Sequence, residues 1–219
     1  MFKTAIFDLD GTLADTFLSI ANTCNQALID AGLHELGNDF YKNHIGIGLE
    51  NLIERAIVET GANVSKYVDR VLSLYQEKFN YNYTYKIKLY PKINSTLEQL
   101  KTKGIRLAVL TNKKHEIAVD VVDYLFGKGD IFDLILSQKE NVPLKPHPEG
   151  PLLLADSFGY NPEECVLIGD TEVDIQTGKN ARMYTVGVLW GFRSKEKLAQ
   201  YQPDRLIQNP EELLGLFTE

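Results

Sequence analysis

Cysteine is scarce in this sequence of 219 residues, which contains two, Cys24 and Cys165. Disulfide frameworks use several cysteines at close spacings, so we expect each thiol to be a small buried side chain rather than a disulfide partner or a metal ligand. The scarcity excludes a disulfide-stabilised secreted domain and favours a reducing compartment. The expected location is the cytoplasm.

Long apolar runs and clustered positive charges are also missing. No apolar segment reaches the roughly 20 residues that a membrane-spanning helix needs, and the opening run, residues 2–7, is too short for a signal peptide. The formal net charge is −7 at pH 7. Because binding to phosphate backbones relies on clustered Lys and Arg, we expect neither a nucleic-acid nor a membrane partner.

The first apolar run leads directly into two carboxylates and a turn, in the sequence AIFDLDGT of residues 5–12. Side chains alternate along a strand, so Asp8 and Asp10 face one site if the extended backbone persists through Leu9, with Gly11 supplying the turn. In open parallel sheets, ligands bind beyond the carboxyl ends of the strands. Taken alone, the motif is more simply a strand followed by an acidic turn.

Two later segments also place polar residues near predicted strand ends or helix starts. The apolar run of residues 106–110 ends in Thr111 and Asn112, whose hydroxyl and turn amides can hold an oxyanion. Lys145 stands beside two prolines, just before a helix predicted over residues 149–158. Taken alone, this second segment is a helix-start signal with an exposed lysine.

A third apolar run, residues 165–168, leads into Gly169 and Asp170, and Asp174 follows four residues later. Taken alone, it predicts a strand, a turn and a helix whose acids suit the positive end of the helix dipole. The order of acids, Thr-Asn, Lys and acids resembles the four sequence motifs of the haloacid dehalogenase superfamily, in its phosphatase branch. The resemblance extends from residue 2 to about residue 217.

Helical spacing of apolar residues replaces the strand-like pattern from about residue 17 to residue 79. Three or four helices without an intervening strand predict a separate small domain, which looks like the helical cap of the superfamily. We expect the cap to span residues 16–85 and the core to comprise residues 1–15 and 86–219. The fold class expected is α/β, a doubly wound parallel-sheet (Rossmann-like) core with an inserted α-helical cap domain.

Two local features of the predicted core concern backbone geometry. The Ser-x-x-Glu pattern of Ser95 and Glu98 is a capping-box signature that predicts a helix from there to residue 103. Lys92 and Arg182 stand where the superfamily usually has glycine, in the pairs Pro91-Lys92 and Ala181-Arg182. Both departures lie outside the four motifs, and they bear on the substrate and on local backbone geometry rather than on chemistry.

A phosphate ester resists attack because its oxygens are already negative, so its hydrolysis needs cations and a positioned nucleophile. The resemblance implies that Asp8 is this nucleophile and forms an aspartyl phosphate, and that Asp10 is the general acid and base. It further implies Mg2+ as cofactor, bound by Asp8, by the backbone carbonyl of Asp10 and by Asp170.

Further roles follow from the same resemblance. Thr111, the amide of Asn112 and Lys145 match the groups that bind the phosphate, and Lys145 also counts among the catalytic residues. Asp174 supports the metal site through water or through Lys145. Thr12 either fixes the loop of the first motif or is a simple turn residue.

The sequences of residues 46–56 and 187–192 resemble those of phosphoglycolate phosphatases. The resemblance implies hydrolysis of a small phosphorylated metabolite, with Gly46 and Gly48 in a substrate-binding loop of the cap. Open alternatives are a sugar-phosphate or nucleotide phosphatase, a pyrophosphatase and a phosphotransferase similar to β-phosphoglucomutase. The non-enzyme alternative is a receiver-like phosphoaspartate signalling module, which also uses acids, Thr or Ser and Lys around Mg2+ on this fold.

Overall fold

The computed structural model describes residues 1–129, 131–138 and 142–217, and its chain divides into two compact units. Unit 1 comprises Met1–Asp15 and Leu89–Glu219, and unit 2 comprises Thr16–Lys88. The sequence placed the second crossing between residues 85 and 86, whereas the structure places it three residues later. The chain therefore leaves unit 1 after Asp15 and returns to it at Leu89, after the 73 residues from Thr16 to Lys88.

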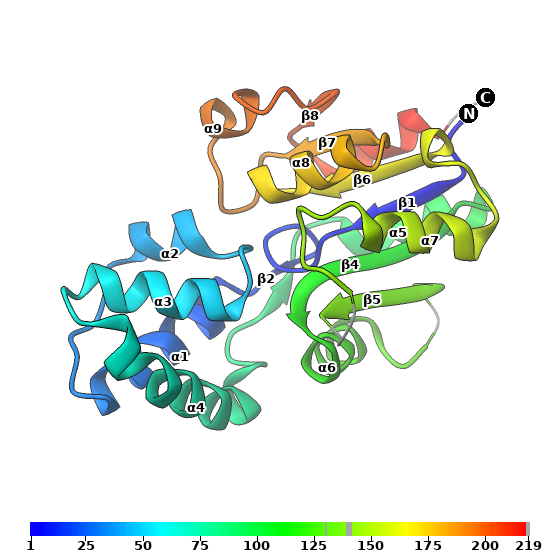
Figure 1. The fold of residues 1–219 in the computed structure, drawn as a ribbon. Coiled ribbons are helices and arrows are strands. Elements are labelled where there is room, and N and C mark those ends of the chain that lie inside the picture. Colours follow the sequence, from blue (N-terminus) through cyan, green and yellow to red (C-terminus); the bar gives the residue numbers. More distant parts are fainter. Residues whose placement is uncertain (130, 139–141, 218–219) are drawn as a thin grey trace. The chain divides into compact units, whose positions relative to one another are not determined.

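Unit 1 is built on a six-stranded sheet whose strand order is β5-β4-β1-β6-β7-β8 (Figure 1). Neighbouring strands pair in parallel throughout. The strands are β1 (Thr4–Phe7), β4 (Arg106–Lys114), β5 (Leu134–Gln138), β6 (Cys165–Gly169), β7 (Tyr184–Val188) and β8 (Arg205–Ile207). The doubly wound parallel sheet predicted from the sequence is confirmed, and β1 lies in its interior, where an uninterrupted apolar run is expected.

Helices cover both faces of this sheet. They are α5 (Ile93–Thr102), α6 (His115–Phe126), α7 (Glu149–Phe158), α8 (Glu172–Asn180) and the short α9 (Lys195–Ala199), with 3-10 turns η1 (Pro162–Glu164) and η2 (Pro210–Leu216). Right-handed crossovers place helices on opposite faces when the chain moves along the sheet in opposite directions. Accordingly, α7 and α8 lie on the near face in Figure 1 and α5 on the far face.

The register of the three central strands brings their carboxyl ends to one edge of the sheet. Phe7 at the end of β1 pairs with Val109 of β4 and with Ile168 of β6. The residues that follow these three positions in the chain therefore lie beside one another. Because these residues include the polar segments selected from the sequence, the topology itself assembles a candidate site.

Unit 2 is helical, as the apolar spacing of its sequence predicts. Its helices are α1 (Phe17–Asp30), α2 (Asn38–His44), α3 (Leu49–Glu59) and α4 (Val64–Asn82). The two segments in which the chain passes between the units form a short second sheet of β2 (Ala14–Asp15) and β3 (Lys88–Leu89). The buried positions of α3 are Leu52, Ile53, Ala56 and Ile57, which recur at intervals of three and four residues. Among the residues described, no helix combines the length and apolar character needed to cross a bilayer.

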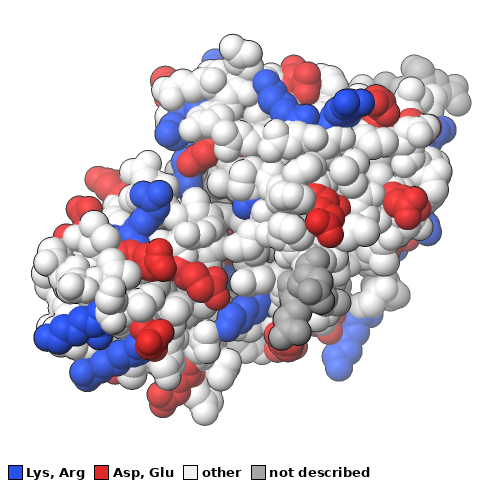
Figure 2. Space-filling model, in the orientation of Figure 1, with Lys and Arg blue, Asp and Glu red and all other residues white. Residues whose placement is uncertain are grey.

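Charged side chains of both signs are interspersed on the surface shown in Figure 2. Two ion pairs illustrate this mixing, Lys92 with Glu211 and Arg106 with Asp133. On that face the described residues form no basic stripe.

The predicted capping box at Ser95 is wrong. Helix α5 begins at Ile93, two residues earlier, so Ser95 lies in its first turn and donates from Oγ to the carbonyl of Lys92 at 3.1 Å. Glu98 instead accepts from Nδ2 of Asn94 at 2.8 Å. The helix starts early because the left-handed backbone of Lys92 sets the turn, which a pattern of side-chain types does not reveal.

Lys92 and Arg182, the two positions singled out by the resemblance, both adopt positive φ, at 68° and 59°. Arg182 follows the end of α8, and the bonds from its own amide to Lys179 and from Met183 to Gly178 close the helix. This left-handed position after a helix is the one that glycine normally occupies. A side chain there costs about 1–2 kcal/mol.

We expect Arg182→Gly to stabilise the protein. Relief of the left-handed strain outweighs the extra backbone entropy of glycine, which is roughly 0.5–1 kcal/mol, so the net gain is roughly 0.5–1 kcal/mol, or about 2 °C in Tm. Arg182→Ala is the matched control, because it removes the same exposed side chain and keeps Cβ. The measurement is the Tm from thermal unfolding. If the Tm of Arg182→Gly is equal to or lower than that of Arg182→Ala, the backbone at this position is not strained.

Candidate active site

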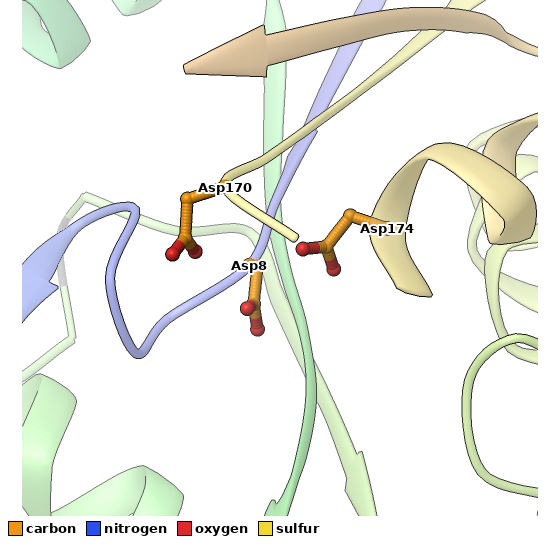
Figure 3. A group of neighbouring side chains, drawn as sticks. All are labelled: Asp8, Asp170 and Asp174. Atoms are coloured by element: carbon orange, nitrogen blue, oxygen red, sulfur yellow. The ribbon is translucent and has the colours of Figure 1, made fainter. Parts of the chain in front are cut away.

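Three carboxylates converge at the carboxyl ends of β1 and β6 (Figure 3). Asp8 follows β1, Asp170 follows β6, and Asp174 lies in the first turn of α8. One oxygen of each lies within 4.8 Å of the others. The three residues are 4%, 0% and 0% exposed, so their charges depend on nearby compensation.

Lys145 provides the cation inside this cluster. Its Nζ lies 2.8 Å from Oδ1 of Asp8 and 2.7 Å from Oδ1 of Asp174. The side chain of Asn112 holds the lysine backbone, because Lys145 N donates to Asn112 Oδ1 at 2.8 Å and Asn112 Nδ2 donates to the Lys145 carbonyl at 3.1 Å. Lys145 thus joins β1 to α8 by its side chain and to the end of β4 by its backbone.

Both oxygens of Asp174 accept hydrogen bonds from the protein. Oδ1 accepts from Lys145, and Oδ2 accepts from the backbone amide and the hydroxyl of Thr171, at 3.0 and 2.7 Å. The Thr171 contacts form a capping box at the start of α8. Asp174 is therefore fixed as the acid that orients Lys145.

Asp170 accepts fewer hydrogen bonds than Asp174, and its side chain is closely surrounded by the backbone of two glycines. Its Oδ1 accepts from the hydroxyl of Thr12 at 3.0 Å and its Oδ2 from the amide of Phe192 at 2.8 Å. A Cβ added to Gly11 or Gly191 would approach the Asp170 side chain to 2.3 Å. Glycine is required at both positions, and the Thr12 hydroxyl contacts a carboxylate of the site rather than serving only its own turn.

The acids are close enough to perturb one another. Burial raises the pKa of Asp8 to about 7, although the Lys145 ammonium opposes this rise. Burial and the neighbouring Asp174 and Asp8 raise the pKa of Asp170 well above its ordinary value. Burial lowers the pKa of Lys145, but the carboxylates of Asp174 and Asp8 outweigh it and leave the pKa above its ordinary value. The cluster therefore has an excess of negative charge that a cation would compensate.

The donors of this cluster suit Mg2+, which prefers carboxylate and carbonyl oxygens and takes few protein ligands. Among the described residues the side-chain cluster contains Asp8, Asp170 and Asp174. The ligand set predicted from the sequence has Asp10 in place of Asp174, with Asp10 contributing its backbone carbonyl. Asp8 and Asp170 are the two carboxylates that this cluster shares with the predicted ligand set.

The side chain of Asp10 contacts a residue that the sequence reasoning missed. Its Oδ2 lies 3.0 Å from Nζ of Lys113, and the two side chains are 12% and 8% exposed. Strand β4 continues through Lys114, whereas the sequence placed its end at residue 110. A register shift interrupts the pairing of β4 with β5 between Leu110 and Lys114. Regular side-chain alternation therefore does not extend through Lys113 and could not have indicated it.

The remaining predicted residues lie in two places. Thr111 is buried, and its Oγ1 accepts from the amide of Lys113 at 3.2 Å. Gly46 and Gly48 belong to unit 2, where they flank Ile47 between α2 and α3 with φ of 106° and 91°. Their positive φ values lie in the region that favours glycine.

Comparisons with known proteins agree with this architecture. The family described as haloacid dehalogenase-like hydrolase matches residues 5–188. The chain is 34% identical over 215 residues to the phosphoglycolate phosphatase of Aquifex aeolicus, covering 98% of this chain and 96% of that one. It is 32% identical over 223 residues to the phosphoglycolate phosphatase of Pasteurella multocida, covering 99% and 98%. The crystal structure of a candidate phosphoglycolate phosphatase from Lactobacillus delbrueckii subsp. bulgaricus has a TM-score of 0.90 at 29% identity, covering 99% and 98%.

A doubly wound sheet with buried carboxylates and a lysine at its strand ends defines an α/β domain with a candidate catalytic centre. The chain belongs to the haloacid dehalogenase-like hydrolase family. It is a phosphatase of this family, as the full-length relatives indicate.

The raised pKa of Asp8 predicts a pH-dependent stability of the metal-free protein. Between its ordinary value of 3.8 and about 7, the folded state retains a proton that the unfolded state has lost, so the free energy of unfolding falls as the pH rises through this window. Asp8→Asn removes this penalty. We expect its stability relative to wild type to increase between pH 5 and pH 8 by on the order of 2 kcal/mol.

Thermal unfolding in a chelator at the two pH values checks this expectation. Comparing the variant with wild type at each pH cancels the shared groups that do not interact with Asp8. Asp8 contributes to the raised pKa of Asp170, so its removal also relieves part of the Asp170 penalty and acts in the same direction. A difference in Tm that stays constant or shrinks from pH 5 to pH 8 contradicts the raised pKa.

Proposed function

We propose that this phosphatase hydrolyses small phosphomonoesters with Mg2+ through phosphorylation of Asp8, and that phosphoglycolate is among its substrates. The observation that carries the proposal is the arrangement of Lys145 between Asp8 and Asp174, at 2.8 and 2.7 Å. One buried ammonium group beside a strand-end carboxylate can bring an anionic nucleophile and an anionic ester together.

In the first step an oxygen of Asp8 attacks phosphorus, and the bond from phosphorus to the leaving oxygen breaks while Asp10 protonates that oxygen. In the second step Asp10 removes a proton from a water molecule, which attacks phosphorus and releases inorganic phosphate and free Asp8. Mg2+, held by Asp8, Asp170 and the Asp10 carbonyl, would neutralise charge on the phosphate. The Thr111 hydroxyl, the Asn112 amide and Lys145 would bind its remaining oxygens.

Substrate choice is assigned to unit 2. The groups of unit 1 recognise a phosphate, so discrimination between esters requires further contacts. We propose that unit 2 acts as a cap and that the backbone around Gly46 and Gly48 contributes these contacts. The full-length relatives named phosphoglycolate phosphatase support phosphoglycolate as the first ester to test.

Two further points support an intracellular enzyme rather than a signalling module. A receiver domain needs neither the helical insertion Thr16–Lys88 nor the acid Asp10, and this chain has both. Cys24 and Cys165 are buried free thiols, which supports a reducing compartment such as the cytoplasm.

We expect Asp8→Asn to abolish Mg2+-dependent hydrolysis, because an amide is a poor nucleophile. Wild-type protein should hydrolyse phosphoglycolate with a higher kcat/KM than sugar phosphates, nucleotides or pyrophosphate. It should also give a phosphate label that is sensitive to hydroxylamine, as an acyl phosphate is. An active Asp8→Asn variant together with an unlabelled wild-type protein would refute the mechanism, and a preference for another ester would replace phosphoglycolate as the substrate.

A further inference from the structure

The Lys113–Asp10 ion pair lies outside the cluster formed by Asp8, Asp170 and Asp174. Its N–O distance is 3.0 Å, and both side chains are close to nine-tenths buried. Exposed ion pairs contribute little because water screens them, whereas an ion pair withdrawn from water holds its partners more strongly. Lys113 therefore constrains the orientation of the Asp10 carboxyl group.

The two oxygens of Asp10 differ in their surroundings. Oδ2 contacts Lys113, while Oδ1 is buried without a hydrogen-bond partner among the described residues. A buried polar atom without a hydrogen-bond partner is costly, so its presence calls for an explanation. A catalytic role is one such explanation. With Oδ2 engaged, Oδ1 is the oxygen left for a proton transfer.

The backbone of Lys113 is tied to the group expected to bind phosphate. Its amide donates to Oγ1 of Thr111 at 3.2 Å. Both residues belong to β4, whose carboxyl end lies beside that of β1. The same strand end thus sets the position of the Thr111 hydroxyl and the position of the Asp10 carboxyl.

We propose that Lys113 is a positioning residue that holds Oδ2 of Asp10 and directs Oδ1 toward the leaving oxygen of the ester. This role rests on the proposed function, in which Asp10 is the general acid. As the Asp8–phosphorus bond forms and the phosphorus–oxygen bond breaks, the proton moves from Asp10 to the leaving oxygen. The Asp10 carboxylate that results is stabilised by the Lys113 ammonium.

The leaving group provides the test. Alkyl phosphates such as phosphoglycolate expel an alkoxide that needs a proton, whereas p-nitrophenyl phosphate expels a stabilised anion that does not. We expect Lys113→Met to lower kcat/KM for phosphoglycolate by about a hundred-fold or more, the range of general-acid catalysis. For p-nitrophenyl phosphate the loss should be less than about ten-fold, since proton transfer contributes little there.

Three further variants separate positioning from a merely structural role. Lys113→Arg keeps a cation at the position and should recover part of the phosphoglycolate activity. Lys113→Met introduced into Asp10→Ala should cause little additional loss, because the group that it positions is gone. Lys179→Met, which removes an exposed lysine at the end of α8, should match wild type on both esters. Mg2+ affinity, measured by calorimetry, should be unchanged in Lys113→Met, whereas its Tm should fall, because the nearly buried Asp10 carboxylate loses its partner.

Equal losses on both esters, or additive losses in the double variant, would overturn the positioning role and indicate direct contact with the phosphate. Loss of Mg2+ affinity in Lys113→Met, without rescue of phosphoglycolate activity by arginine, would overturn it in favour of a structural role. A wild-type protein that hydrolyses none of the esters in the presence of Mg2+ would overturn the proposed function and the role of Lys113 with it. Wild-type hydrolysis combined with equal losses would overturn the role of Lys113 alone.

Discussion

The ion pairs of Lys145 with Asp8 and Asp174 are the interaction on which this active site depends. Three carboxylates are buried around one ammonium group, and transferring unpaired charges out of water is expensive. Hydrogen bonds donated to Asp170 and Asp174 by the hydroxyls of Thr12 and Thr171 and by the Phe192 amide lower this cost. The charge that remains uncompensated is the property that suits the cluster to a divalent cation and an anionic ester.

The fold places these groups by strand register. Because β1 lies between β4 and β6, residues far apart in sequence reach one edge of the sheet, and Asn112 fastens the segment that carries Lys145 to the end of β4. Glycine at positions 11 and 191 leaves the space that Asp170 occupies. Activity and folding are therefore coupled, since the buried acids that suit catalysis also destabilise the metal-free protein at high pH.

Much of this arrangement could be predicted from the sequence, because strand ends have a local signature. Asp8 and Asp170 follow apolar runs directly, and the parallel sheet follows from alternating strands and helices. The sequence did not indicate Lys113, because β4 continues beyond its apolar part. The early start of α5 was not predicted because it depends on the backbone conformation of Lys92. The bonds that engage Asp174 are tertiary, so spacing alone does not reveal that Lys145 and Thr171 occupy both of its oxygens. The roles assigned to Gly46 and Gly48 stay predictions.

We propose that the buried acids Asp8 and Asp170 bind a divalent cation. Anomalous diffraction from crystals soaked in Mn2+, which binds the same oxygen ligands as Mg2+, would locate this cation. We expect one strong peak in contact with carboxylate oxygens of Asp8 and Asp170, lost in an Asp170→Ala crystal. A peak bound elsewhere, or no peak at saturating Mn2+, would contradict it.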